Sequence, residues 1–587
     1  MRDRGSEGET CRCDLLVAGS GAGGMAAALT ARLAGLEVLV VEKEPLVGGT
    51  TARSGGWLWI PGSPHARAAG IADSKEAARL YLRHETGNHF DPERVEAFLE
   101  AGPAMVELLE RRTRVRFVLG PHFSDYHPDA PGGLPGGRSI CAEPFDAREL
   151  GSAVALLRPP LEEITLLGMM VGSGKELTHF FNVTRSLESA VYVAALLARY
   201  GRDRLLHGRA MRLTNGNALA GRLLASARDL GIAIWCSAPL VELVVEEGRV
   251  VGGIVARGGR RVRVEARAGV VLATGGFPQD AERRARLFPH CALGGSHWSP
   301  APTGNTGDGI RLAAALGAAT ADDLPAAAAW VPVSLVPRRD GTTGVFPHFV
   351  DRAKPGVIAV TDAGRRFCNE ADSYHDFCKA MLEACRGLPG EPHAWLLADH
   401  RAIRRYGLGW AKPFPVPLAP ALARGYLRRG RSWAELAAVC GIEAAALERT
   451  VGTYNEAARR GEDPAFGRGR TAYNRYLGDP GVAPNPCVAP LEEPPFYAVR
   501  LVMGDLGTFA GLRTDAAARV LDRTGRPIPG LRACGNDMAS IMGGNYPGGG
   551  ITLGPAMTFG YLAALDAARA LGRAAPSASL AARAGAA

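Results

Sequence analysis

Residues near the N-terminus have the types and spacing that bind a dinucleotide. Gly19, Gly21 and Gly24 follow an apolar run, Leu15 to Ala18, in GxGxxG spacing, and Glu42 ends the next apolar run. Glycines allow a tight turn and let the backbone approach a pyrophosphate, while an acidic residue at the second strand end accepts hydrogen bonds from a ribose. The spacing therefore predicts a dinucleotide site built by a strand, a helix and a second strand.

The fingerprint alone leaves NAD and FAD open, but two later stretches favour FAD. GGTTARSGG, 48–56, is a second glycine-rich loop whose amides could line a flavin and its ribityl chain. RVVGGIVARGGRRVRVEARAGVVLATGGF alternates like a hairpin and ends in a buried strand with an ATGG turn, which closes a discontinuous nucleotide domain in many flavoproteins. The predicted cofactor-binding residues are Gly19, Ser20, Gly21, Ala22, Gly23, Gly24, Glu42, Lys43, Gly48, Gly49, Thr50, Thr51, Ser54, Gly55, Gly56, Ala273, Thr274, Gly275, Gly276, Gly535, Asn536, Thr552 and Leu553.

A second candidate site lies near the C-terminus, in GGNYPGGGITLGPAMTFGYLAA, 543–564. Tyr546 and Pro547 stand among five glycines directly before an amphipathic helix. The plainer interpretation is a tight turn followed by a helix. The other is that Gly550, four residues after Tyr546, offers a backbone amide to the same oxygen atom as the tyrosine hydroxyl.

Composition limits the class of protein and its partners. The chain has 587 residues, 47% of them hydrophobic and 22% charged, which is enough for two or three globular domains. Its net charge of +9 is small for this size and its basic residues are scattered, so no nucleic-acid partner is predicted.

Cysteine and histidine spacing argues against a metal site or a secreted disulfide scaffold. The eleven cysteines lack CxxC pairs, and His122, His127 and His375 lack paired ligand spacing. The polar N-terminus has no apolar segment of a signal peptide, and no apolar run reaches the roughly 18 residues of a membrane span. We expect a cytoplasmic protein, with peripheral membrane contact left open because a hydrophobic substrate would favour it.

Together these blocks resemble the fumarate reductase flavoprotein superfamily over most of the chain. The resemblance covers 14–56, 215–232, the ATGGF turn, TGDGIRLAAALGA at 306–318 and the C-terminal block. It implies an α/β fold in which a discontinuous Rossmann-type domain holds FAD without a covalent bond. An α+β substrate domain would be inserted between the two halves of the FAD domain.

Three stretches further resemble the 3-ketosteroid Δ1-dehydrogenases within this superfamily. They are LRACGNDMASIMGGNYPGGGITLGPAMTFGYLAA, GRRFCNEADSYHDF at 364–377 and FSDYHPDAPGGLPGGRS at 123–139. The resemblance implies the 1,2-desaturation of a hydrophobic cyclic ketone, a 3-oxosteroid, with an external electron acceptor such as a quinone. Tyr374 would be the base and Tyr126 its hydrogen-bonding partner, while Tyr546 and Gly550 polarise the ketone and flavin N5 takes the hydride.

This chemistry explains why phenols are needed. A base must take the proton next to the ketone, and donors must stabilise the enolate oxygen that develops. A phenol with its ordinary pKa of about 10 is a poor base near neutrality unless its anion is stabilised. A second phenol and the positive end of a helix would do so, and we expect an alkaline optimum.

Three other functions remain open from the sequence. A 3-oxo-5α-steroid Δ4-dehydrogenase would use a similar site on a different pair of carbons. A fumarate-type reductase would need an arginine donor and a histidine–arginine clamp, but NYPGGG occupies the position where such reductases carry charged residues. A non-catalytic FAD-binding protein would keep the glycine motifs without the tyrosines.

Proline-bearing connections suggest the domain boundaries. We expect an N-terminal FAD part at 1–290, an inserted substrate domain at 291–478, a C-terminal FAD part at 479–575 and a disordered tail at 576–587. The segment 158–205 reads as a helix pair over the site entrance.

Overall fold

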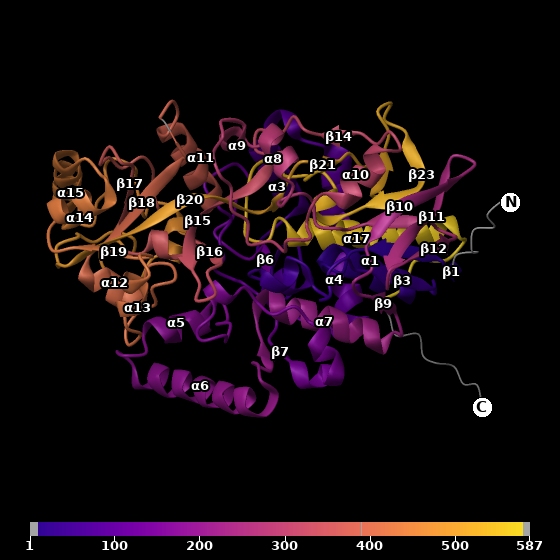
Figure 1. Cartoon of the computed structure of the whole chain (residues 1–587), viewed down its shortest axis with the longest axis horizontal. Coiled ribbons are helices and arrows are strands. Elements are labelled where there is room, and N and C mark those ends of the chain that lie inside the picture. Colours follow the sequence, from indigo (N-terminus) through magenta and orange to yellow (C-terminus); the bar gives the residue numbers. More distant parts are fainter. Residues whose placement is uncertain (1–9, 389, 579–587) are drawn as a thin grey trace.

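The computed structural model describes residues 10–388 and 390–578, so most of the predicted disordered tail, 579–587, lies outside the described residues. The molecule is elongated, with one large sheet at each end of its long axis (Figure 1). The strands at one end come from the parts 10–272 and 519–533, and those at the other end come from 328–508 (Figure 1).

The nucleotide-binding sheet joins strands from both ends of the sequence. Its order is β22 (Arg519–Leu521), β23 (Pro527–Ala533), β13 (Val270–Leu272), β2 (Leu15–Ala18), β3 (Val38–Val41) and β9 (Ala233–Trp235). All neighbours are parallel except β22 and β23. The strands β2, β3 and β13 are buried throughout, as expected for a parallel sheet covered on both faces. Because β13 pairs with β2 and β23, the predicted discontinuous domain is confirmed.

Two helices pack together across this domain at small residues. A Cβ on Gly560 of α17 (Leu553–Ala570) would lie 2.3 Å from the carbonyl oxygen of Gly23 in α1 (Ala22–Leu33). A Cβ on Gly23 would lie 3.0 Å from the carbonyl oxygen of Ala556. The backbones of the first and last helices of the domain therefore touch, which fixes the N-terminus of α17 against the glycine fingerprint.

A four-stranded sheet lies beside the nucleotide-binding sheet. Its order is β1 (Thr10–Cys13), β12 (Arg260–Ala266), β11 (Arg249–Arg257) and β10 (Leu240–Glu246). The antiparallel pair β11–β12 is the hairpin predicted from alternating apolar residues.

The inserted part is built on a second six-stranded sheet. Its members are β16 (Thr343–Pro347), β15 (Ala328–Pro337), β20 (Phe496–Thr508), β18 (His393–Ala398), β17 (Val357–Val360) and β19 (Arg428–Gly430), all antiparallel. Helix α11 (Tyr374–Ala384) packs on β15, where the Trp330 amide donates to His375 Nδ1 at 3.1 Å.

The domain division stays a prediction, and strand pairing bears on one of its boundaries. The strand β20 lies in the range 479–575 that we assigned to the FAD domain, but its ladder partners are β15, β18 and β19 of the inserted sheet. A boundary drawn by sheet membership would therefore come after β20.

The remaining elements connect and cover these sheets. A small antiparallel sheet consists of β4 (Trp57–Trp59), β6 (Ser139–Ala142) and β5 (Phe117–Leu119). Short pairings are β7 (Phe145–Asp146) with β8 (Arg212–Leu213), and β14 (Thr320–Ala321) with β21 (Gly511–Leu512). The other helices are α2 (Pro64–Ala68), α3 (Lys75–Thr86), α4 (Pro92–Arg112), α5 (Lys175–Phe181), α6 (Leu187–His207), α7 (Asn215–Asp229), α8 (Ala281–Leu287), α9 (Pro289–Ala292), α10 (Asp308–Ala314), α12 (His400–Tyr406), α13 (Ala419–Ala423), α14 (Trp433–Cys440), α15 (Ala444–Ala458) and α16 (Ala472–Leu477).

The contact between α1 and α17 predicts a strong sensitivity to one methyl group. Gly560→Ala should lower stability by about 1–3 kcal/mol, because the added Cβ overlaps the Gly23 carbonyl. Gly452→Ala is the matched control: Gly452 is also helical, nothing lies within 4 Å of its Cβ position, and it should gain up to ~1 kcal/mol from helix propensity. Melting temperatures of the two purified variants test this, and equal values would contradict it.

Candidate active site

Most of the predicted cofactor residues meet in one cavity with a volume of about 1060 Å³. The predicted residues that line it are Gly19, Ser20, Gly21, Ala22, Gly23, Glu42, Lys43, Gly49, Thr50, Thr51, Ser54, Ala273, Thr274, Gly275, Gly535, Asn536, Thr552 and Leu553. Gly55 and Gly56 line an adjoining cavity instead, and Gly24, Gly48 and Gly276 line neither. We call the first cavity the dinucleotide pocket.

The fingerprint glycines have different physical tasks. A Cβ on Gly19, whose φ is +112°, would lie 2.1 Å from the Ala273 carbonyl oxygen. A Cβ on Gly24 would lie 2.1 Å from the Gly19 carbonyl oxygen. These two glycines therefore permit close backbone packing. Gly21 instead faces open space, with only Thr51 Oγ1 at 3.7 Å, so it leaves room for a ligand.

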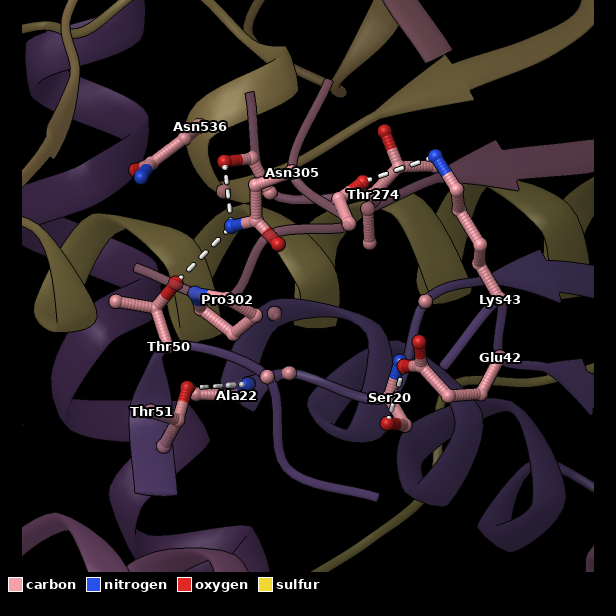
Figure 2. A pocket seen from close by; sticks show the side chains of 18 of the residues that line it. Ser20, Ala22, Glu42, Lys43, Thr50, Thr51, Thr274, Pro302, Asn305 and Asn536 are labelled. Atoms are coloured by element: carbon pink, nitrogen blue, oxygen red, sulfur yellow. Dashed lines mark hydrogen bonds between the residues drawn. The ribbon is translucent and has the colours of Figure 1, made fainter. Parts of the chain in front are cut away.

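The start of α1 is prepared for an anion. Gly21 is the N-cap residue and no side chain caps it. One amide of the first turn, that of Ala22, donates to Thr51 Oγ1 at 3.0 Å (Figure 2). Because the first-turn amides of a helix lack intrahelical partners, this end of α1 suits the pyrophosphate of a dinucleotide.

The acidic residue of the fingerprint is held in place by its own turn. The Glu42 carboxylate is buried and accepts from the Ser20 amide at 3.0 Å, the Ser20 hydroxyl at 2.5 Å and the Glu44 amide at 2.9 Å. Figure 2 shows Glu42 beside Ser20 at the edge of the pocket. A carboxylate has about four acceptor positions, so one remains for a ribose hydroxyl.

Lys43 lines the pocket but its ammonium group is engaged elsewhere. It donates to the Gly304 carbonyl at 3.1 Å, to Thr306 at 2.8 Å and to Asp308 at 2.7 Å. Its evident task is to hold the loop 304–308 against the pocket.

Two residues that sequence reasoning missed hold the cofactor loops together. The Asn305 side-chain amide donates to Thr50 Oγ1 at 3.0 Å and to the Gly275 carbonyl at 3.2 Å (Figure 2). The buried Asp537 carboxylate accepts from the amides of Thr274, at 2.6 Å, and Gly276, at 3.0 Å. Asp537 directly follows the predicted Gly535–Asn536 pair, and an acidic residue in that turn was a usable signal.

These features fit FAD. A dinucleotide needs open space over Gly21, free amides at the start of α1 and a carboxylate at the end of β3, and all three are present. The pocket also continues into the second cavity, since Thr50, Ser54, Leu506, Thr552 and Leu553 line both. A flavin ring at this junction would face the second cavity.

The second cavity is lined by tyrosines, and we call it the tyrosine cavity. It has an empty volume of about 1190 Å³. Tyr126, Tyr374, Tyr546 and Gly550, the four predicted catalytic residues, all line it. They come from the loop before β6, from the start of α11 and from the turn before α17, so the fold brings distant segments together.

The three predicted tyrosines contact one another. The Tyr126 hydroxyl donates to the Tyr374 hydroxyl at 3.0 Å. The rings of Tyr126 and Tyr546 are stacked with centroids 5.5 Å apart, and the Tyr374 ring meets the Tyr546 ring edge-on at 4.9 Å. A fourth tyrosine, Tyr473, also lines the cavity, with its ring 4.4 Å from that of Tyr126, and no local motif predicted it.

Burial controls the protonation of these phenols. Desolvation raises the pKa of Tyr374 and of Tyr126 well above the ordinary value of 10. Burial also raises the pKa of Tyr546, to about 12, although hydrogen bonds to Tyr374 and Thr552 oppose the rise. At neutral pH the phenols are therefore uncharged, and the Tyr546 hydroxyl keeps a proton that it can donate to a ligand.

Tyr374 also lies at the positive end of a helix, as the proposed base requires. It is the first residue of α11, which Ser373 caps by accepting from the Asp376 amide at 3.1 Å. The helix dipole favours negative charge at this end. A phenolate on Tyr374 would thus be stabilised by α11 and by the Tyr126 hydroxyl.

Gly550 presents the free amide that the sequence suggested. Its φ is +99°, and a Cβ there would lie 2.5 Å from the Trp57 backbone, so glycine is required. Its carbonyl accepts from the amides of Trp59 and Gly554. Its own amide donates to no group within residues 10–388 and 390–578, and Gly550 is one of the residues that line the cavity. The helix α17 begins three residues later, directly after the glycine turn.

Pro547 connects the turn that holds Tyr546 to the loop that holds Tyr126. Its carbonyl oxygen accepts from the Tyr126 amide at 2.9 Å and from the Tyr81 hydroxyl at 2.6 Å. His127, beside Tyr126, bridges Glu85 at 2.7 Å and Asp376 of α11 at 2.8 Å. Burial lowers the pKa of His127, but its bonds to Asp376 and Glu85 outweigh this and raise it to about 10. A charged histidine therefore fastens the loop to α11.

Two further observations concern the described part of the chain. No group of three His, Cys, Asp or Glu side chains there could hold a metal ion. None of its helices is both long and apolar enough to cross a membrane.

Comparison with known proteins places this geometry in a family. Residues 14–553 match the FAD binding domain family. The chain is 43% identical to the 4-oxocyclohex-2-ene-1-carboxylate 5-dehydrogenase of Sinomonas cyclohexanicum, covering 96% of this chain and 95% of that protein. It is 39% identical to the 3-oxosteroid 1-dehydrogenase of Mycobacterium tuberculosis (strain ATCC 25618 / H37Rv), covering 95% and 99%.

A solved structure agrees with the sequence relatives. The crystal structure of the 3-ketosteroid Δ1-dehydrogenase from Sterolibacterium denitrificans, in complex with 1,4-androstadiene-3,17-dione, has a TM-score of 0.88 and 38% identity, covering 95% of this chain and 100% of that chain. The protein is thus an FAD-dependent oxidoreductase. It belongs to the 3-ketosteroid Δ1-dehydrogenase family.

The link between the cofactor loops predicts a measurable loss of affinity. Asn305→Ala removes the hydrogen bonds to Thr50 and Gly275 and should raise the Kd for FAD about tenfold, as expected for the loss of about 1–1.5 kcal/mol. Gln279→Ala removes a similar bond, to the Ala301 carbonyl, outside the pocket and is the control. Titration of the apoprotein with FAD measures both values, and an unchanged Kd in Asn305→Ala would contradict the assignment.

Proposed function

We propose that this enzyme removes one hydrogen from each of two adjacent carbons beside a ring ketone, as in the 1,2-desaturation of a 3-oxosteroid. The observation that supports it most is the group of buried phenols, Tyr126, Tyr374 and Tyr546, around a cavity that continues into the dinucleotide pocket. Removal of a proton next to a carbonyl needs a base and an oxyanion donor, and phenols can supply both.

Tyr546 and Gly550 would bind the ketone oxygen. Tyr546 keeps its proton, because burial raises its pKa to about 12, and the Gly550 amide is free. Both groups can donate to one oxygen, and their hydrogen bonds strengthen as that oxygen becomes an enolate. The α-carbon is thereby made acidic enough for a phenolate to deprotonate.

Tyr374 would take the α-proton. In its phenolate form Tyr374 accepts a hydrogen bond from the Tyr126 hydroxyl. Its negative charge also lies at the N-terminus of α11, where the helix dipole stabilises it. The proton moves from the α-carbon to the Tyr374 oxygen, and the electron pair of that C–H bond delocalises to the ketone oxygen. The carbon–carbon double bond forms as the β-carbon loses hydrogen with its electron pair. Bound FAD supplies the hydride acceptor.

The relatives suggest two kinds of ring ketone. One relative is an enzyme named for a 3-oxosteroid, and another is an enzyme named for a 4-oxocyclohexene carboxylate. Both compounds carry the ketone on a six-membered ring. The 3-oxosteroid is the first candidate, and a monocyclic keto acid is the second because its enzyme is 43% identical to this chain. Desaturation at the Δ4 position remains an outcome that product analysis distinguishes.

A fumarate-type reductase is the weaker proposal. It would need a histidine–arginine clamp for two carboxylates, whereas the described lining of the tyrosine cavity includes one arginine and no histidine.

The partners beyond the substrate stay predictions. A dehydrogenase with FAD passes its electrons to an external acceptor, a quinone or another oxidant. Helix α6 exposes Leu187 (82%), Val191 (61%), Leu205 (89%) and Leu206 (68%), which supports the expected peripheral membrane contact.

The oxyanion assignment predicts a selective loss of catalysis. Tyr546→Phe should lower kcat/KM on a ring ketone about 10²- to 10³-fold, because one donor to the enolate oxygen is lost. The FAD content should stay at the level of the unaltered protein. Tyr561→Phe, on α17 but outside the cavity lining, is the control and should turn over normally. Turnover in Tyr546→Phe within threefold of the control would remove Tyr546 from the site.

The base assignment predicts the pH dependence. Only the phenolate of Tyr374 accepts a proton, and burial raises its pKa well above 10, so the active fraction grows as pH rises. We expect kcat/KM to rise about tenfold per pH unit between roughly pH 6 and 9 without levelling off. Steady-state rates with a slowly reacting ketone measure this, with retained FAD absorbance as the check for stability. A flat profile over that range would show that Tyr374 is not the base.

A further inference from the structure

One charged side chain lies among the described residues that line the tyrosine cavity. It is that of Arg53, from the second glycine-rich loop. Its neighbours in the lining are aromatic, aliphatic or neutral, with Trp57, Phe123 and Tyr476 packed ring against ring. Arg53 does not line the dinucleotide pocket, although Thr50 and Ser54 of the same loop do. Its position therefore concerns whatever occupies the tyrosine cavity.

Within the described residues, Arg53 has no carboxylate partner. One guanidinium nitrogen donates to the Pro300 carbonyl oxygen at 2.8 Å. The acidic residues that influence it, Glu44 and Glu163, each pair with another arginine, and the Oε2 atom of Glu163 has no hydrogen-bond partner among the described residues. Arg158 pairs with Glu44 at 3.5 Å, and Arg338 donates to Glu163 at 2.7 Å. The remaining donors of Arg53 are left for a ligand.

An unpaired cation in an apolar cavity is unfavourable by itself. Burial lowers the pKa of Arg53, and the positive charge of Arg158 lowers it further. A guanidinium nevertheless remains protonated in proteins, so the charge persists, and the Pro300 carbonyl with the charges of Glu44 and Glu163 offsets only part of its desolvation. Its planar fork of donors matches a carboxylate, which would relieve this cost.

We infer that Arg53 binds a carboxylate carried by the substrate, so that the site takes an anionic ring ketone. This rests on the proposed function, because the ketone end is assigned to Tyr546 and Gly550. The two anchors would hold the substrate at both ends and so select which pair of carbons reacts. A neutral ketone leaves Arg53 unpaired, so the site should discriminate against it more strongly than shape alone allows.

The carboxylate could stand on a single ring or on the side chain of a steroid. The experiment therefore uses two acids with their methyl esters: 4-oxocyclohexanecarboxylate and 3-oxochol-4-en-24-oate. Androst-4-ene-3,17-dione serves as the neutral steroid. The FAD-loaded enzyme should favour one of the acids over its ester by at least about tenfold in kcat/KM, the loss expected when a charged hydrogen bond is removed. Which acid shows the preference identifies the source.

Variants at Arg53 test the residue itself. Arg53→Gln should bring the acid-to-ester ratio close to one, chiefly through a higher KM for the acid, and Arg53→Lys should keep part of the preference. Arg424→Gln is the matched control, because Arg424 also donates to a proline carbonyl, that of Pro337, but lies outside the cavity lining. It should keep the full ratio. FAD absorbance per chain confirms that each variant is folded.

A binding measurement separates this inference from the proposed reaction. Cyclohexanecarboxylate has no ketone to react, and it should bind the unaltered enzyme at least tenfold more tightly than cyclohexanecarboxamide, a difference lost in Arg53→Gln. Arg53-dependent binding without turnover of any ketone would support the carboxylate site and refute the proposed function. Turnover with equal rates for acid and ester, or a ratio unchanged in Arg53→Gln and Arg53→Lys, would overturn the inference and leave the proposed function standing.

Discussion

The hydrogen bond between the hydroxyls of Tyr126 and Tyr374, 3.0 Å long, joins parts of the chain that fold on different sheets. Tyr126 belongs to the loop beside the small sheet of β4, β5 and β6, and Tyr374 begins a helix on the inserted sheet. Tyr546, from the turn before α17, lies against both rings. None of these segments holds the whole constellation, so the chemistry depends on how the domains pack together.

Polar contacts of the neighbouring residues hold the two tyrosines of this hydrogen bond in position. Pro547 accepts from the Tyr126 backbone, so the odd proline among the glycines of the C-terminal turn has a structural task. His127 links the same loop to Asp376 of α11. The phenols that these contacts position stay uncharged at rest, which avoids burying an anion, and the cost is that the base forms only at high pH. Burial of the phenols thus both avoids a buried charge in the resting protein and shifts the reaction to alkaline pH.

Local features of this protein were predictable and long-range ones were not. The parallel strands, α1, the hairpin β11–β12 and the start of α17 follow from glycine spacing and apolar periodicity, which act over a few residues. Tyr546 and Gly550 stand in one turn, so their common exposure to the cavity could be anticipated. Tyr374 and Tyr126 were reached only through resemblance, because no local pattern shows that residues 248 positions apart share a hydrogen bond.

The residues that were missed depend on tertiary packing. Tyr473 lies on a short helix without a motif, and it reaches the site because α16 lies against the Tyr126 loop. Asn305 and Asp537 connect cofactor loops that are far apart in sequence. Arg53 stands inside a predicted cofactor loop, yet it lines only the tyrosine cavity, whereas Thr50 and Ser54 of the same loop line both cavities. Likewise, β20 follows the predicted boundary but pairs with the inserted sheet, since strand pairing is not local.

A ring ketone bound in the tyrosine cavity would lose a proton to Tyr374 and a hydride to FAD in the adjoining pocket. Anaerobic mixing of the FAD-loaded enzyme with a saturated or monounsaturated ring ketone tests it most directly, with the visible absorbance of the flavin and the product's new double bond recorded together. We expect the flavin to bleach as one equivalent of desaturated ketone forms. No bleaching by any steroid or cyclohexanone substrate, with reoxidation of the reduced flavin by fumarate, would contradict it.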